Sequence, residues 1–409
     1  MTHRFWKLTV PLIIVFLIMR SFSGTAGAGE IDILVHKLVE KGVLTPAEAQ
    51  TLLAETKQEV KTQMAKAKLD TVPEWMQRIT LKGDFRLREQ YQKRDESEDR
   101  WRARIRARLG LEAMVNEKAK LGIGIATGQN DPRSTNLTLS DSSGADDIKF
   151  DFAYGQYMLT DWLTLTGGKF KNPIWTSWSD LIWDTDINPE GVAAQFAGKH
   201  GNWGWFVNSG YVVLDEYSGS GSDPFMLFVQ PGFDYFFSDK TNLRFAGIHY
   251  NTTHTEGAVL DYSSESNTGA TTGLEYEYDL FGATAQLNML SLHPRVACTS
   301  VFADYIYNTD PDDDETGWLV GFGLGEEKIK ERGQWQLRYS YRKLERDAVP
   351  DILPDSDFFG GATNAKGHEG VLEYGIGKNM SLALDYYKTE QDEGDLEEDL
   401  LQFDWNFRF

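Results

Sequence analysis

The feature of this sequence that most constrains its fold is a two-residue alternation of apolar and polar side chains, which runs from about residue 78 to the C-terminus. Its clearest example is WRARIRARLGLEAMV at residues 101–115, in which apolar residues alternate with Arg102, Arg104, Arg106 and Arg108. Successive side chains of a β-strand point to opposite faces, so these four arginines share one face of a strand. An aromatic content of 13% and 38 glycines also fit an all-β protein.

The alternation predicts sixteen strands, an even number such as closed bacterial outer-membrane barrels have. They are expected at residues 79–90, 101–115, 118–129, 147–159, 162–171, 191–199, 203–214, 225–237, 241–250, 272–290, 296–307, 316–325, 333–345, 367–376, 379–389 and 398–409.

The connections between these strands alternate strictly between short and long. The short ones are near residues 116–117, 160–161, 201–202, 238–240, 293–294, 327–332 and 377–378. The long ones are 91–100, 130–146, 172–190, 215–224, 251–271, 308–315, 346–366 and 390–397. This layout predicts a 16-stranded antiparallel transmembrane β-barrel over residues 78–409, with periplasmic turns at one rim and extracellular loops at the other. A soluble secreted β-sandwich, such as a carbohydrate-binding protein, would explain the aromatic content and acidity but not the alternation.

The last strand ends on an aromatic residue. Its alternating aromatic residues face one side, which we expect to be the lipid side: Phe403, Trp405, Phe407 and Phe409. A terminal aromatic in this setting resembles the C-terminal signal of outer-membrane barrels, which the barrel assembly machinery reads.

The first 28 residues have the pattern of a secretory signal peptide. Arg4 and Lys7 precede an apolar stretch at 8–19, and Ala26 and Ala28 frame a small-residue cleavage site, so we expect cleavage after Ala28. The alternative is an uncleaved anchor helix. No cysteine directly follows the apolar stretch, which argues against a lipoprotein anchor.

Residues 29–72 carry the spacing of a helix rather than of a strand. Apolar residues recur at helical intervals from Ile31 to Val39, and Thr45-Pro46 starts a second helical stretch after Gly42. The apolar stripe is narrow, so we expect a short periplasmic helical segment that pairs with a copy of itself in a coiled coil. A loosely ordered helical linker is the alternative.

Two features predict the contents of the lumen. The first is a row of cations on two neighbouring strands: Lys82, Arg86, Arg88, Arg102, Arg104, Arg106 and Arg108. The second is the third long loop, KNPIWTSWSDLIWDTDINPEG, with three tryptophans and with Asp180, Asp184 and Asp186. We expect this loop to fold inward, so that its carboxylates face the arginines across a constriction. The alternative is a loop that caps the rim or contacts a neighbouring subunit.

Charge and motifs exclude several other functions. A net charge of −21 argues against a nucleic-acid partner, because binding to phosphate backbones requires a cationic surface. No nucleophile, zinc-protease, nucleotide-binding or CxxC motif occurs, so neither a catalytic site, a cofactor nor a metal site is predicted. The acidic stretch 310–316 lacks the glycine and distal glutamate of an EF-hand and is interpreted as a surface loop.

Several stretches together resemble the putative porin family of Gram-negative outer membranes. They are LVEKGVLTPAEAQTLLAET, ITLKGDFRLR, RWRARIRARLGLEAMVN, GIATGQNDPRSTNLTL, LTLTGGKFKNPIWTS, LIWDTDINPEGVAAQF and the closing FRF. The resemblance implies a signal peptide, a short periplasmic helical segment and a pore-forming barrel, general-porin-like in form. It supplies neither a substrate nor tested site residues.

The leading hypothesis is therefore an outer-membrane porin, a passive channel for small hydrophilic solutes or ions rather than an enzyme. Expected partners are outer-membrane lipid, lipopolysaccharide and the barrel assembly machinery, with a homotrimer by analogy to general porins. One alternative is a structural or adhesive barrel anchored to the cell envelope through its N-terminal helix. Another is an outer-membrane enzyme on a barrel scaffold, although no Ser/His or Asp/His group supports it.

Overall fold

The computed structural model describes residues 74–409 apart from 141, 143, 220 and 294. The chain divides into two units, Met1–Gln77 and Arg78–Phe409. In the first unit the described part is a short helix, α4 (Glu74–Gln77). The predicted signal peptide, 1–28, and the predicted helical segment, 29–72, lie outside the described residues. None of the described helices is long and apolar enough to cross a membrane.

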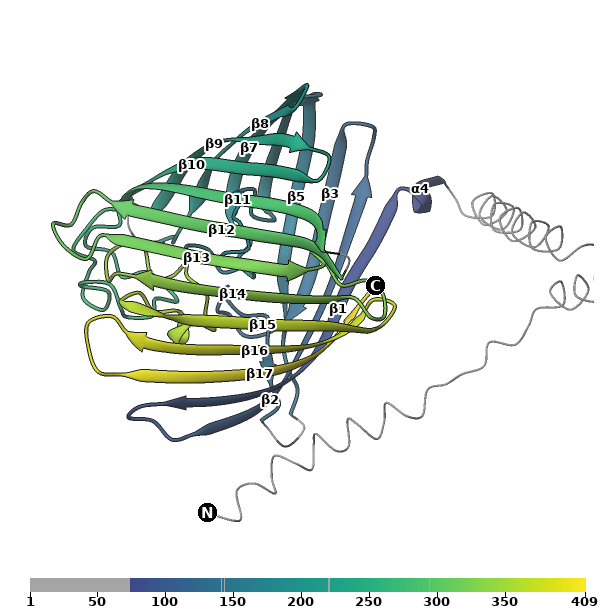
Figure 1. Cartoon of the computed structure of the whole chain (residues 1–409). Helices are drawn as coiled ribbons and strands as arrows, with labels where there is room; N and C mark the ends of the chain where they lie inside the picture. The colour runs from purple at the N-terminus through teal and green to yellow at the C-terminus, as the bar shows by residue number, and fades with distance from the viewer. Residues whose placement is uncertain (1–73, 141, 143, 220, 294) are drawn as a thin grey trace, which may run out of the picture. The chain divides into compact units, whose positions relative to one another are not determined.

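The second unit is a single closed sheet of 17 strands in which every pair of neighbours is antiparallel (Figure 1). The strands are β1 (Ile79–Arg94), β2 (Arg100–Met114), β3 (Ala119–Thr127), β4 (Leu137–Thr138), β5 (Ile148–Thr160), β6 (Leu163–Lys169), β7 (Glu190–His200), β8 (Trp203–Val213), β9 (Phe225–Ser238), β10 (Thr241–Thr253), β11 (Asp279–His293), β12 (Val296–Asn308), β13 (Thr316–Gly325), β14 (Trp335–Leu344), β15 (Ala365–Gly377), β16 (Met380–Gln391) and β17 (Glu397–Arg408).

The ring closes where β1 pairs with β17, with Phe85 opposite Phe407. The two-residue β4 pairs with β2 beyond the end of β3 and continues that ladder, so the other sixteen strands form the barrel. The predicted barrel of sixteen antiparallel strands is confirmed. The strand predicted at 272–290 is wrong in its first part: β11 begins at Asp279, because residues before it leave the wall and pack inside the barrel.

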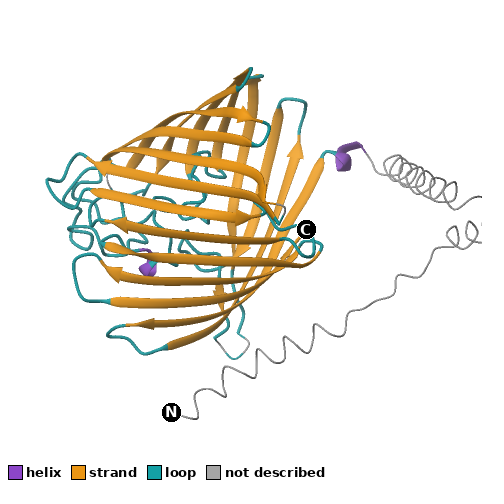
Figure 2. Ribbon diagram, viewed as in Figure 1, coloured by secondary structure: helices purple, strands orange, loops and turns teal. Residues whose placement is uncertain are grey.

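The two rims of the barrel differ, as the lengths of the connections require. Tight turns such as 201–202 and 378–379 join strands at one rim, here called the turn rim. Long loops join them at the other, the loop rim, and Figure 2 shows several of these loops inside the ring of strands. The first strand and the C-terminus meet near the turn rim, where the backbones of Gly83 and Phe409 exchange N–H···O bonds of 3.0 Å in both directions.

The barrel has an apolar outer face and a polar inner face. On β17 the inward Gln402 is 0% exposed, whereas its outward neighbour Phe403 is 36% exposed. The outer face of other strands carries exposed Leu87, Leu109 and Val301. A soluble protein buries the apolar set, so this inverted pattern is that of a barrel in lipid. The predicted aromatic row of the last strand lies on the outer face, where the tilted rings of Trp405 and Phe407 have centroids 5.0 Å apart.

An apolar core fills part of the lumen. Three loops supply most of it, namely the β6–β7 loop (170–189), the β10–β11 loop (254–278) and the β14–β15 loop (345–364). Their buried side chains pack on inward apolar residues of the wall, among them Met226, Tyr250 and Phe302. The wall between β8 and β14 is therefore covered by loops, while the charged wall of β1 and β2 lies outside this core.

Candidate functional site

The β6–β7 loop crosses the interior and is bonded to strands far apart around the ring. Near its start, Lys171 pairs with Asp151 of β5 at 3.2 Å. Farther along, the backbone N–H of Trp175 donates to Gln230 of β9 at 2.8 Å. The hydroxyl of Ser177 donates to Asp304 of β12 at 3.2 Å. These bonds hold the loop inside the barrel, against the inner wall from β5 to β12.

The three tryptophans of this loop lie against the inner wall. Trp178 packs edge-on to Phe302, with ring centroids 6.1 Å apart, and its ring occupies the space that a Cβ would take at Gly323 of β13. Trp183 is buried and donates its Nε1–H to the hydroxyl of Tyr250 at 3.0 Å. Trp175 contacts Phe206 of β8 edge-on. Only a glycine at position 323 admits the ring of Trp178 at this depth.

The loop's three aspartates have different partners. Asp186 accepts bonds from Arg108 on β2 at 3.0 Å and from the Thr135 hydroxyl at 2.9 Å. Asp180 pairs instead with Arg342 on β14 at 3.1 Å. Asp184 accepts two backbone N–H groups, those of Asp186 and Ser356, and so joins this loop to the β14–β15 loop.

The loop carboxylates also differ in acidity. Burial raises the pKa of Asp180 to about 6, with a further rise from the charge of Glu369, and Arg342 opposes both only in part. Burial would likewise raise the pKa of Asp186, but Arg106 and Arg108 outweigh it and hold that pKa below its usual value. Asp186 therefore stays ionised beside β2 at neutral pH, whereas the pKa of Asp180, about 6, lies close to neutral pH.

The arginines of β1 and β2 face the lumen in pairs set by the register, with Arg86 opposite Arg106 and Arg88 opposite Arg104. Near the turn rim they are neutralised: Arg106 and Arg108 pair with Asp84 at 2.9 and 2.8 Å. On β1, Arg88 makes two bonds to Asp404 of β17, at 2.7 and 2.8 Å.

Nearer the loop rim the arginines have neutral partners. Arg102 donates to the side-chain oxygen of Gln92 at 2.9 Å, and Arg104 to that of Gln90 at 3.1 Å. Among the described residues neither arginine lies within ion-pair distance of a carboxylate. The row of cations therefore changes from neutralised to uncompensated along its length.

The structure adds residues to the site that the alternation alone did not reveal. Asp357, on the β14–β15 loop, pairs with Arg88 at 3.0 Å, and Asp355 lies 3.6 Å from Arg342. Arg133, buried on the β3–β4 loop (128–136), donates to the carbonyl oxygens of Asp351 and Tyr262, both at 2.8 Å. The apolar residues of the β14–β15 loop could have predicted that this loop also folds inward, because such side chains are rarely exposed to solvent.

The predicted constriction residues thus divide into three sets. The first set forms two ion-pair clusters: Arg86 and Arg88 pair with Asp404, whereas Arg106 and Arg108 pair with Asp84, and Arg108 also pairs with Asp186. Arg102 and Arg104 lie beside these clusters. Lys82 is placed apart, exposed near the turn rim and 3.3 Å from Glu112, and Asp180 and Asp184 face other loops and β14.

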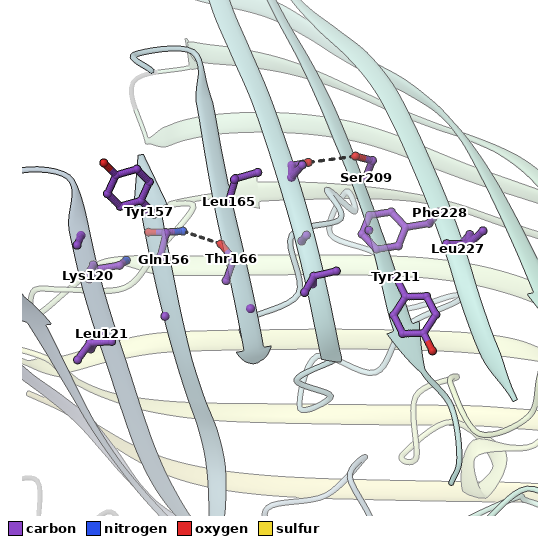
Figure 3. A pocket seen from close by; sticks show the side chains of 17 residues that line it. Lys120, Leu121, Gln156, Tyr157, Leu165, Thr166, Ser209, Tyr211, Leu227 and Phe228 are labelled. Carbon is purple, nitrogen blue, oxygen red and sulfur yellow. Dashed lines mark hydrogen bonds between the residues drawn. The ribbon is translucent and has the colours of Figure 1, made fainter. Parts of the chain in front are cut away.

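A groove on the described surface lies on the outer face of the barrel. Figure 3 shows its lining side chains on adjacent strands from β3 to β9. Those that point outward are apolar and exposed, among them Leu121, Leu165 and Leu227. The groove therefore lies in the apolar band of the barrel, where lipid would contact it.

Several solved structures share this fold. OprB of Pseudomonas putida, in its high-pH structure, is 12% identical over 81% of this chain and 94% of its own, with a TM-score of 0.55. OmpF of Salmonella typhi, in a complex with daunomycin, is 11% identical over 81% of this chain and 97% of its own, with a TM-score of 0.51. These likenesses concern the fold. No curated protein matches the sequence.

The family comparison goes further than the fold. A family model described as putative porin matches residues 89–285 and 293–409, which is more than half of the chain. The family and the inverted barrel point to an outer-membrane channel rather than to an enzyme. The chain belongs to the putative porin family.

Proposed function

We propose that this protein is a passive diffusion channel for small hydrophilic solutes or ions, whose path runs between the arginine wall of β1 and β2 and the β6–β7 loop. A sixteen-stranded ring is wide enough to hold an aqueous channel. The observation that carries the proposal is the crossing loop itself: it is bonded to Asp151 on one side of the ring and to Arg342 on another. A loop held in this way would narrow the channel without blocking it.

The electrostatics of the narrowing support a transverse field. Asp186 stays ionised beside Arg106 and Arg108, and the cations of β1 and β2 lie on the opposite side of the path from the apolar core of loops. Fixed charges concentrated on one side of a channel orient water and polar solutes and select among them by charge.

The proposal extends to export and assembly. Residues 1–28 would direct the chain out of the cytoplasm, and residues 29–72 would lie in the periplasm. The aromatic row ending in Phe409 would be the signal that the barrel assembly machinery reads, and the apolar outer band would contact lipid and lipopolysaccharide. A homotrimer is proposed by analogy with general porins.

Single-channel recording of the refolded protein in a planar bilayer, under a potassium chloride gradient, tests the proposal. Stable current steps are expected, and the sign of the reversal potential reports whether cations or anions pass preferentially. A correctly folded, heat-modifiable barrel that passes no current would overturn the channel and favour a structural or adhesive role.

A further inference from the structure

The two arginines of the row nearest the loop rim, Arg102 and Arg104, have among the described residues no carboxylate partner such as a purely structural arginine would need. Arg102 and Arg104 are half-buried on the inner face of β2, two residues apart, so their side chains point the same way. Each donates a hydrogen bond to the side-chain oxygen of a neutral glutamine, Arg102 to Gln92 and Arg104 to Gln90. A guanidinium that only stabilised the wall would be expected to meet a carboxylate, as Arg106 and Arg108 do.

Nearby carboxylates do not compensate these two charges. Asp357 and Glu398 act on Arg102 through space, but each already has a cation of its own. Asp357 pairs with Arg88 at 3.0 Å, and Glu398 lies 3.7 Å from Arg94. The region therefore keeps an excess of positive charge.

Hydrogen-bond donors in this region are also left over. The Nε atoms of Arg102 and Arg104 are enclosed and have no partner among the described residues, and the Nε of Arg86 is in the same state. An enclosed donor without a partner destabilises the fold. An anion that entered the lumen would instead meet the outer N–H groups of Arg102 and Arg104, which are only half-buried, because a guanidinium presents several N–H groups that match the oxygens of a carboxylate or phosphate.

We propose that Arg102 and Arg104 form a binding station for the oxyanion group of a small acidic solute, a carboxylate or a phosphate, on the loop-rim side of the narrowing. Gln90 and Gln92 are positioning residues, because their side-chain oxygens fix the two guanidinium groups. The solute then passes the neutralised arginines nearer the turn rim, where the ion pairs with Asp84 hold it less strongly. This binding station adds a class of solute to the proposed channel function, and it rests on that function.

The test compares ion preference and oxyanion sensitivity in four chains. R102Q/R104Q removes both charges. T138D keeps both arginines and places a carboxylate opposite Arg104, because Thr138 is its register partner on β4. K93Q/K388Q is the matched control: Lys93 and Lys388 are exposed at outward positions and make no ion pair among the described residues.

The readouts are the reversal potential in a potassium chloride gradient and the fall in single-channel conductance when inorganic phosphate or acetate is added. Wild type and K93Q/K388Q are expected to favour anions and to be blocked by at least one of the two oxyanions. R102Q/R104Q is expected to lose the block and to shift the anion-to-cation ratio by about fivefold towards cations. T138D shifts it in the same direction. A stronger block by phosphate than by acetate assigns the station to phosphates, and the reverse to carboxylates.

The failures of the two proposals are distinguishable. A folded wild-type chain that passes no current overturns the channel function and the station with it. A conducting wild type whose ion preference and oxyanion block persist unchanged in R102Q/R104Q overturns the station alone. If R102Q/R104Q does not fold, T138D decides by the same two readouts.

Discussion

The carboxylate of Asp186 lies 3.0 Å from Nη1 of Arg108, which ties the β6–β7 loop to a wall strand 78 residues earlier in the chain. Both side chains are largely enclosed, and Asp186 also holds the β3–β4 loop through Thr135. One carboxylate therefore joins the loop that crosses the lumen, a second inward loop and the cationic wall.

Replacing Asp186 by asparagine is expected to loosen this junction. D186N keeps the size of the side chain but leaves Arg108 with Asp84 alone, at a cost of about 1–3 kcal/mol for the lost charge-assisted bonds. We expect a shift of ion preference towards anions and a larger size limit for neutral polymers that enter the channel. Bilayer recordings with polyethylene glycols of graded size measure both.

The matched control for that variant is E190Q, at the first residue of β7, directly after the same loop. Glu190 pairs with Lys169 at 2.8 Å, but it is mostly exposed, and surface ion pairs contribute little. E190Q is expected to behave as wild type. Equal size limits in D186N and wild type would contradict an anchoring role for Asp186.

Gly323 is expected to tolerate no side chain. The ring of Trp178 lies where its Cβ would be, so G323A must push the tryptophan, and the loop that carries it, off the wall. Overpacking of this kind costs roughly 1–3 kcal/mol. Urea-gradient unfolding followed by heat-modifiable gel migration should show G323A unfolding at a lower urea concentration than wild type.

G370A provides the comparison, because Gly370 lies on β15 with nothing within 4 Å of its Cβ position. It should unfold as wild type does. If G323A matched G370A, the packing of Trp178 on β13 would not contribute to the stability of the fold.

Much of the barrel was predictable because the information is local. In a strand that faces the lumen on one side and lipid on the other, polar and apolar side chains alternate every two residues. The strands around Arg102 and Phe403 can therefore be recognised from their own sequence, without knowledge of the neighbouring strands. The end of such a run is less certain. Residues 272–278 look like the start of β11, yet Leu274 and Tyr278 are buried in the lumen core. Their place depends on loops that the local pattern does not describe.

The pairing of charges could not be predicted for the same reason. Which carboxylate meets Arg342 depends on the path of the β6–β7 loop, and Asp180 lies 162 residues from it in the chain. The sequence showed that four arginines share one face of β2, but it gave no way to tell them apart. It could not show that two of them pair with Asp84, one of these also with Asp186, and that glutamines hold the other two.

Acidity should change the ion preference through Asp180. Burial raises its pKa to about 6, so lowering the pH from 7 to 5 adds a proton to a carboxylate that is charged at pH 7. The folded protein then binds a proton that the unfolded chain, with an ordinary aspartate, does not hold in this range, so the stability contributed by this group rises as the pH falls. Arg342 loses an anionic partner, and anions should pass more readily at pH 5.

Reversal potentials measured at half-unit steps between pH 5 and 7 test this expectation, with D180N as the comparison. The asparagine is neutral throughout, so D180N should lack the part of the transition centred near pH 6 and should resemble the low-pH wild type at pH 7. A transition of the same size and midpoint in D180N would assign it to other groups.

The C-terminal residue is expected to contribute to closure of the barrel. Phe409 exchanges two backbone hydrogen bonds with Gly83, and its ring lies where a Cβ of Gly83 would be. Deleting Phe409 removes both bonds, each contributing about 0.5–1.5 kcal/mol, together with the ring's contact on β1. The yield of heat-modifiable barrel on refolding into detergent should fall. F409W keeps the backbone bonds and an aromatic ring and should refold like wild type; equal yields for all three chains would show that the closure does not depend on this residue.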